Sequence, residues 1–318
     1  MLKLLAGRLG SGAVTLALVS LIIYIATIAL PGDAAVAVLG KTATPESLAA
    51  FRAEHHLDQP AALRYLAWIG DLATGDFGTS VVSGEPAGEL LVSRGLRTLT
   101  LMAFAVVIGF PLGTAIGVFA AVRRNSTVDH AVSLIMLVIT GIPEFALAVL
   151  TVLLLSTTVF QLFPAVSIYN ADQPIFAQFD VLVLPILTLL LTILPYIALT
   201  IRSSMIEILD SDFVAMARLK GVPEGRVVLR HALANAAGPL IQVFAVTLVY
   251  MAGGAIIVET VFQFPGLGSA LVEAVRNRDL VVVQATTLVL AIVYIGVNIL
   301  ADLVVVALTP RLRTKVTA

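Results

Sequence analysis

Long apolar runs separated by short polar segments dominate the pattern of this 318-residue chain. A run of about 20 apolar residues is typical of a helix that spans a membrane, and six segments of the chain contain one. These segments cover residues 13–30, 96–122, 128–163, 181–201, 240–258 and 284–308. The pattern therefore predicts an all-α integral membrane protein with six transmembrane helices.

The third apolar segment is interrupted by Gly141-Ile142-Pro143-Glu144, which predicts a broken helix. A carboxylate at membrane depth costs a few kcal/mol at least. Two interpretations stay open for Glu144. It lines a transport path near the break, or it caps the helix that resumes there, where the helix dipole favours an anion.

Two other apolar segments carry patterned small or polar residues. In the second segment Gly109, Gly113 and Gly117 fall near one face, and this spacing predicts a close approach of another helix backbone. In the last segment three polar residues four apart share a face, where they serve interhelical hydrogen bonds or a ligand. These three are Tyr294, Asn298 and Asp302.

Residues 32–95 form the one long polar region and hold eight acidic residues. Helical patterns begin at Pro45 and cover 61–72, and a turn is predicted at 75–78. The region therefore predicts a small folded subdomain outside the bilayer. The first apolar run is interpreted as an uncleaved signal-anchor, although Ala35-Val36-Ala37 resembles a signal-peptidase site. The predicted organisation is 1–31, 32–95 and a transmembrane domain over 96–318.

Positive charges predict the orientation. With both termini in the cytoplasm, 12 of the 19 lysines and arginines lie in the short inner segments, as the positive-inside rule expects. Residues 32–95 then face outward and residues 203–239 face the cytoplasm. The net charge of −1 gives no electrostatic case for a nucleic-acid partner.

Motifs for catalysis and cofactor binding fail on inspection. Gly40-Lys41-Thr42 resembles the end of a phosphate-binding loop, but Ala35 stands where the first glycine is needed. The chain has no cysteine, so it has no thiolate metal site. His55-His56 lacks the spacing of a metal pair on one helix face. We expect no enzyme activity, metal or bound cofactor in this chain.

The segment from Asp212 to Pro239 is polar and basic between two apolar segments. Its first half has a helical pattern, Gly221-Val222-Pro223 breaks it, and a second helix is predicted from about Glu224. Glu224 near the start of that helix and Arg230 near its end suit the helix dipole. We interpret the segment as a docking surface for a soluble partner. The alternative is a charged loop that only sets the topology.

A series of short motifs occurs along the chain in a particular order and spacing. They are Leu30-Pro31-Gly32-Asp33, Leu57-Asp58-Gln59-Pro60, Gly75-Asp76-Phe77-Gly78, Asp212-Phe213-Val214, Arg230-His231-Ala232-Leu233, Val258-Glu259-Thr260-Val261-Phe262, Pro265-Gly266-Leu267-Gly268 and Arg278-Asp279. By these motifs the chain resembles the inner-membrane permease subunits of dipeptide/oligopeptide ATP-binding cassette (ABC) importers. The resemblance implies a type I ABC importer permease fold.

The resemblance also implies the function and the partners. This chain would form half of a translocation path for peptides in the bacterial inner membrane. A second homologous permease would form the other half. Two ATPase subunits would bind ATP and Mg, and an extracytoplasmic binding protein would deliver the cargo.

The same resemblance implies two groups of site residues. One group would couple the chain to the ATPases: Asp212, Ala215, Ala217, Arg218, Lys220, Gly221, Pro223, Glu224, Arg226 and Arg230. The other would line the translocation pathway: Glu144, Glu259, Phe262 and Asn298.

The chain departs from the family pattern at three places. Ala215-Met216-Ala217 stands where the general importer signature has Glu-Ala-Ala, and Thr309 replaces the aspartate expected before Pro310. Glu144 occupies a position that is otherwise uncharged. A permease for nickel or another small solute is therefore an alternative. An ion-gradient-driven transporter is a further one, although no convincing internal repeat supports it.

Overall fold

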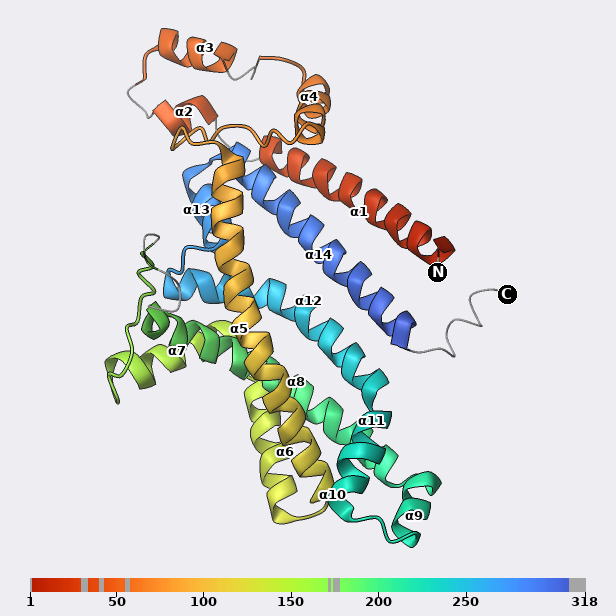
Figure 1. The fold of residues 1–318 in the computed structure, drawn as a ribbon. Coiled ribbons are helices and arrows are strands. Elements are labelled where there is room, and N and C mark those ends of the chain that lie inside the picture. Colours follow the sequence, from red (N-terminus) through yellow and green to blue (C-terminus); the bar gives the residue numbers. More distant parts are fainter. Residues whose placement is uncertain are drawn as a thin grey trace. The chain divides into compact units, whose positions relative to one another are not determined.

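The computed structural model describes residues 2–29, 34–39, 43–54, 58–170, 173 and 178–308 (Figure 1). Five helices in these ranges contain a stretch long and apolar enough to cross a membrane. They are α1 (Leu2–Ala29), α5 (Ala87–Val122), α8 (Phe179–Leu209), α12 (Ala237–Phe262) and α14 (Leu280–Leu308). Five of the six predicted apolar segments are thus single long helices, most of them longer than predicted.

The sixth is the predicted broken segment. Helix α6 (Thr127–Thr140) and helix α7 (Glu144–Val152), which continues as a π-helical turn over Leu153–Thr157, are bent by 103° at their junction. Pro143 cannot donate a backbone hydrogen bond and disfavours helical geometry in the residue before it. The break predicted at residues 141–144 is therefore confirmed.

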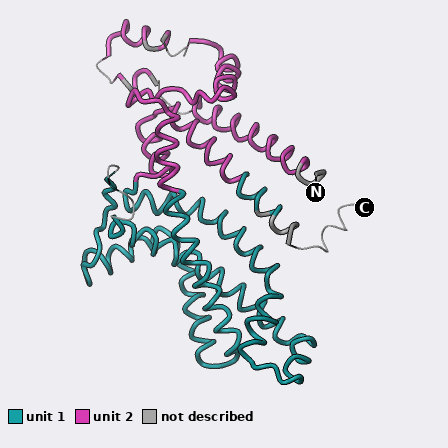
Figure 2. Tube along the Cα trace, viewed as in Figure 1, with its two compact units in different colours: residues 1–5, 99–264, 296–318 teal, residues 6–98, 265–295 magenta. Residues whose placement is uncertain are grey.

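The chain divides into two compact units (Figure 2). Unit 1 comprises residues 1–5, 99–264 and 296–318, and unit 2 comprises residues 6–98 and 265–295. Residues 265–295 thus belong with the N-terminal part of the chain, which the sequence did not indicate. The predicted boundaries at 31 and 95 remain predictions.

Helix α8 is the centre of unit 1. It packs against α6, α7 and α12, and it contributes buried side chains along most of its length, including Leu182, Leu189, Ile197 and Met205. A helix that is apolar on nearly every side is typical of a position enclosed by other helices.

The glycines of α5 allow this helix to lie directly against α8. A Cβ built on Gly109 would fall 2.7 Å from the tip of Ile193, and one on Gly113 would fall 2.8 Å from Ile197. On Gly117 it would fall 2.6 Å from the backbone oxygen of Ala198. The close approach predicted from the four-residue spacing is confirmed.

Unit 2 contains the predicted polar subdomain. Its helices α2 (Ala34–Leu39), α3 (Pro45–Glu54) and α4 (Ala61–Ala73) include the two predicted ones. Helix α4 is tied to α1, because the hydroxyl of Tyr24 donates to the backbone oxygen of Ala61 over 2.8 Å. The rings of Tyr24 and Trp68 also stack with centroids 6.0 Å apart. These contacts make the region a folded structure rather than a loose loop.

Two side chains of unit 2, Asp279 and Thr98, serve as helix caps. Asp279 is 3% exposed, accepts a hydrogen bond from the hydroxyl of Ser80, and caps the start of α14 by accepting from the backbone N–H of Val282. At the start of α13 (Leu267–Asn277) the N–H of Leu267 donates to the hydroxyl of Thr98 over 2.9 Å. Both side chains satisfy N–H groups that a helix end leaves unpaired.

Several sequence interpretations concern residues outside the described ranges. They are Leu30 to Asp33, Gly40-Lys41-Thr42, His55-His56, Leu57 and the basic tail from Thr309.

The glycine series on α5 gives a graded prediction. Gly117→Ala should lower the midpoint of thermal unfolding in detergent more than Gly109→Ala, because its methyl would meet backbone rather than the end of a side chain. Overpacking of this kind costs about 1–3 kcal/mol. Gly88→Ala on the same helix is the control, since its methyl would lie 3.6 Å from Phe77. Equal shifts of the unfolding midpoint in the Gly109 and Gly117 variants would contradict the closer contact of Gly117 with the backbone of α8.

Candidate functional site

The polar segment between α8 and α12 is helical on both sides of a turn. Helix α9 spans Asp212–Leu219. Helix α10 (Glu224–Arg226) continues through a π-helical stretch (Val227–Ala232) into α11 (Leu233–Asn235). The second helix therefore begins at Glu224, as predicted.

Gly221 ends α9 in a left-handed conformation with φ +75°. Its N–H donates to the carbonyl of Arg218 over 2.9 Å, and the N–H of Val222 donates to the carbonyl of Ala217 over 3.2 Å. This pair of bonds is a Schellman motif, which satisfies carbonyls at a helix end and is usually built on glycine. Pro223 follows it and immediately precedes the next helix, so the bend is specified by local sequence.

An ion pair closes the same turn from the outside. The Nη2 and Nε atoms of Arg218 lie 2.6 Å and 3.1 Å from the two carboxylate oxygens of Glu224. Hydrogen bonds from Arg218 lower the pKa of Glu224, and the carboxylate in turn raises the pKa of Arg218. Arg218 also donates from Nη1 to the backbone oxygen of Leu209 over 3.3 Å. One side chain thus joins α9, α10 and the end of α8.

The inner face of this segment is anchored in the core of unit 1. The anchoring side chains are apolar and buried: Val214, Ala217, Val227, Val228 and Ala232. Nine of the ten residues predicted to contact an ATPase are exposed, and the exception is Ala217, which is 8% exposed. We therefore assign Ala217 a packing role and keep the other nine as surface candidates.

Exposed apolar side chains add to this surface. Phe213, Met216 and Leu219 on α9 are 47%, 53% and 82% exposed, and Leu229 on the following helix is 65% exposed. The spacing of three residues places the α9 side chains along one side of the helix. These apolar residues were not among the predicted contact residues, although their spacing of three is visible in the sequence.

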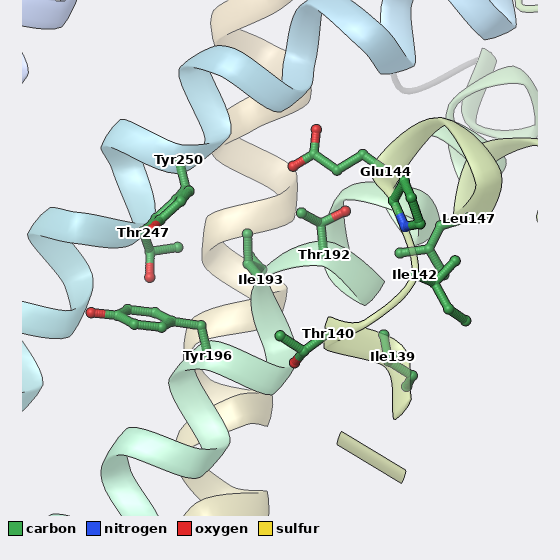
Figure 3. A pocket seen from close by; sticks show the side chains of 11 residues that line it. Ile139, Thr140, Ile142, Glu144, Leu147, Thr192, Ile193, Tyr196, Thr247 and Tyr250 are labelled. Atoms are coloured by element: carbon green, nitrogen blue, oxygen red, sulfur yellow. The ribbon is translucent and has the colours of Figure 1, made fainter. Parts of the chain in front are cut away.

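A second candidate site is a cavity of about 340 Å³ at the bend between α6 and α7 (Figure 3). Its walls come from α6, α7, α8 and α12, and all belong to unit 1. The polar and aromatic lining residues are Thr140, Glu144, Thr192, Tyr196, Thr247 and Tyr250.

Glu144 is the first residue of α7 and lines this cavity. The carboxylate thus stands at the start of a helix and also faces a cavity, and its part in a transport path stays a prediction. In Figure 3 its side chain reaches from the start of α7 toward α12. A Cβ built on Gly254 of α12 would lie 2.9 Å from both carboxylate oxygens.

The other three residues predicted for the pathway lie elsewhere. Glu259 and Phe262 are fully buried near the end of α12 and do not line the cavity. Asn298 lies on α14, outside the cavity lining, and has an interaction partner. Their part in a pathway stays a prediction.

A buried ion pair joins α6 to α8 within unit 1. Arg202 places Nε and Nη2 at 2.5 Å and 2.7 Å from the carboxylate of Asp129, which is 1% exposed. Losing one partner of a buried pair leaves an uncompensated charge, so this bridge fixes α6 against α8.

Two family models match the chain. Residues 113–314 match the inner membrane component of binding-protein-dependent transport systems, and residues 1–86 match the N-terminal part of such components. The chain belongs to this family. It is a multi-pass permease subunit of a bacterial inner-membrane ABC importer.

Relatives in bacteria are similar to this permease over nearly its whole length. A protein of Sinorhizobium fredii named as a peptide ABC transporter permease is 31% identical over 96% of this chain and 97% of its own length. A peptide transport system permease of Brucella abortus is 33% identical over 98% and 99%. The glutathione transport system permease GsiC of Salmonella choleraesuis is 36% identical over 95% of each chain.

A solved structure supports the fold of the permease. A chain of the inward-facing MetNI methionine ABC transporter matches with a TM-score of 0.57 and 22% identity, covering 71% of this chain and 99% of that chain. At this identity the similarity shows the type I importer permease fold alone.

No metal site accompanies either candidate site. Within the ranges that the structure describes, no group of three or more histidines and carboxylates lies close enough to hold a metal ion.

The Arg218–Glu224 pair predicts a pH dependence of the turn. Because the folded-state pKa of Glu224 is lowered, the contribution of the pair is full above the ordinary pKa of 4.5 and is lost as the pH falls below it. Amide hydrogen exchange of residues 221–226 should lose protection in that range. At pH 7, Glu224→Gln should lower protection by up to about fivefold, since exposed pairs contribute about 1 kcal/mol or less.

Glu207→Gln is the matched control, because Glu207 is an exposed glutamate near the end of α8. It should leave the exchange of residues 221–226 unchanged. Protection that is the same at pH 7 in wild type and Glu224→Gln would argue against the pair as a clasp of the turn.

Proposed function

We propose that this permease forms half of the translocation pathway of an ATP-driven peptide importer, and that residues 203–239 transmit ATPase movements to its membrane helices. Its partners are a second homologous permease, two ATPase subunits that bind ATP and Mg, and an extracytoplasmic substrate-binding protein. Both termini and the 203–239 loop face the cytoplasm, in line with the distribution of lysine and arginine.

The observation that supports the proposal most strongly is the exposed apolar surface on α9 of the loop. Phe213, Met216 and Leu219 expose apolar surface outside the membrane-spanning windows, on a helix whose other side is anchored in the core of unit 1. An amphipathic helix with exposed apolar residues on one side suits a groove on a partner. Basic side chains next to it, Lys220, Arg226 and Arg230, favour an acidic rim on that partner.

The loop is also built to transmit force. Its bend is specified by the Schellman motif at Gly221 and held by the ion pair of Arg218 with Glu224. Arg218 also contacts the last turn of α8. Movement of a partner seated on α9 therefore acts on α8 through short, directional bonds. A flexible loop with no such bonds would absorb the movement instead.

Peptides are the proposed cargo because the relatives over nearly the full length are named as peptide and glutathione permeases. Glutathione is itself a small peptide, so both names support one class of cargo. The pairing of a carboxylate with threonine and tyrosine side chains in the cavity suits a polar solute of this kind.

The proposal predicts the energy source. The permease would be reconstituted in liposomes with the ATPases, second permease and binding protein that co-purify with it. Uptake of a labelled dipeptide should require both enclosed Mg-ATP and the binding protein. Uptake driven by a proton gradient without ATP would refute the proposal and favour a secondary transporter.

The left-handed turn at Gly221 leads to a prediction for a variant that lacks coupling between ATP hydrolysis and uptake. Gly221→Val should lower ATP-dependent uptake by about tenfold while membrane insertion is unchanged, because a β-branched residue at φ +75° is strained by at least 1–2 kcal/mol. The added side chain meets nothing within 4 Å, so the effect comes from the backbone alone.

Gly225→Val is the control for this variant. Gly225 also has open space around it, but its φ is not positive, so valine is tolerated. In Gly225→Val, ATP hydrolysis should drive uptake as in the wild type. In Gly221→Val, ATP should still be hydrolysed but should drive much less uptake. Normal coupling in both variants would remove the turn from the transmission path.

A further inference from the structure

The cavity at the α6–α7 bend contains a carboxylate without a counter-charge. Glu144 is half-buried, and no lysine, arginine or histidine is among the residues that line the cavity. Within the described part of the chain, its carboxylate makes no hydrogen bond or ion pair. The α7 dipole offsets only part of the charge. A carboxylate in a membrane segment is costly, and a cation that enters the cavity would stabilise it.

Gly254 provides the space that this carboxylate occupies. A methyl group on Gly254 would stand 2.9 Å from both oxygens, so any other residue would displace the Glu144 side chain. The neighbouring Gly253 has nothing within 4 Å. The two adjacent glycines therefore separate the effect on Glu144 from the effect of adding a methyl to α12.

Thr247 is an independent sign that the cavity is a binding site. It lines the same cavity from α12, is 2% exposed, and its hydroxyl oxygen has no hydrogen-bond partner in the described structure. A buried polar atom without a partner is costly and is uncommon in native proteins. A ligand that donates a hydrogen bond in this cavity would satisfy it.

Two tyrosines complete the lining on the side of α8 and α12. The rings of Tyr196 and Tyr250 lie with centroids 5.9 Å apart. Aromatic faces attract cations, and ammonium groups in particular. A carboxylate, a hydroxyl acceptor and aromatic rings together are the chemistry that recognises an ammonium group.

We propose that this cavity binds a primary ammonium group of the cargo, with Glu144 as its counter-ion, Thr247 as a hydrogen-bond acceptor and Tyr196 and Tyr250 as the aromatic wall. The inference rests on the proposed function, because it takes the cavity to be entered by peptide during transport. An ammonium group is present at the amino terminus of a peptide and on a lysine side chain.

A binding experiment on the purified full-length permease tests the site without transport. Three probes are compared by the rise in unfolding temperature: Ala-Ala amide, N-acetyl-lysine amide and N-acetyl-Ala-Ala amide. The first two carry one ammonium group each, and the third carries none. Stabilisation by an amine probe but not by the third supports the site, and the better amine identifies the source of the ammonium group.

Variants assign the effect to this cavity. Glu144→Gln should weaken amine binding at least tenfold, and Gly254→Ala should weaken it by displacing the carboxylate. Gly253→Ala should bind as wild type does. Thr247→Val should weaken binding and yet raise the unfolding temperature of the free protein, because it removes an unpaired buried hydroxyl. A purely structural threonine would not show this opposite pair of effects.

Several results would overturn the inference. They are equal stabilisation by the acetylated probe, equal stabilisation by sodium chloride at the same concentration, and undiminished amine binding in both Glu144→Gln and Gly254→Ala. Reconstituted transport separates the inference from the proposed function. If ATP-dependent uptake occurs and Glu144→Gln keeps the wild-type preference for Ala-Ala amide over its acetylated form, the ammonium site alone is refuted. Amine binding without any ATP-dependent uptake refutes the proposed function alone.

Discussion

Pairing of backbone polar groups is the constraint on which the rest of this structure depends. In an apolar phase only helices satisfy their N–H and carbonyl groups within one segment, and a break is tolerated only inside protein or beside a polar cavity. The α6–α7 junction obeys this rule, because its 103° bend lies at the wall of the cavity of unit 1. Outside the apolar segments the same requirement is met differently, by the Schellman bonds at Gly221 and by side-chain caps such as Asp279.

Charges inside the apolar segments follow from the same physics, and two carboxylates illustrate opposite solutions. Asp129 is buried and neutralised by two short bonds from Arg202, so its role is to hold α6 against α8. Glu144 lies at the other end of the α6 region with no such partner among the described residues, and it faces a cavity rather than packed side chains. The difference between them is what separates a structural carboxylate from a candidate binding residue.

Sequence reasoning recovered what is local and, apart from the close approach at the glycines of α5, missed what is tertiary. Apolar run length predicted all six helical segments, Gly-Ile-Pro-Glu predicted the break, and Gly221 with Pro223 predicted the turn, because each depends on neighbours in the chain. Two contacts join residues that are more than 70 positions apart in the sequence: Arg202 with Asp129, and Glu144 with Gly254. The periodicity of the sequence does not indicate either contact. Phe213, Met216 and Leu219 were readable from spacing, but their exposure depended on how α9 is anchored.

The two candidate sites are joined by two continuous helices. Helix α8 carries Thr192 and Tyr196 in the cavity and ends at Leu209, whose carbonyl binds Arg218 of the loop. Helix α12 begins at Ala237, in the last residues of the loop, and carries Thr247 and Tyr250. In the proposed mechanism, a partner that moves α9 would displace the base of both helices that form the far walls of the cavity, while Glu144 is held on α7. Because packed helices move as rigid elements, such a displacement changes the distance between the carboxylate and the tyrosines, which is how a cation would be held and then released.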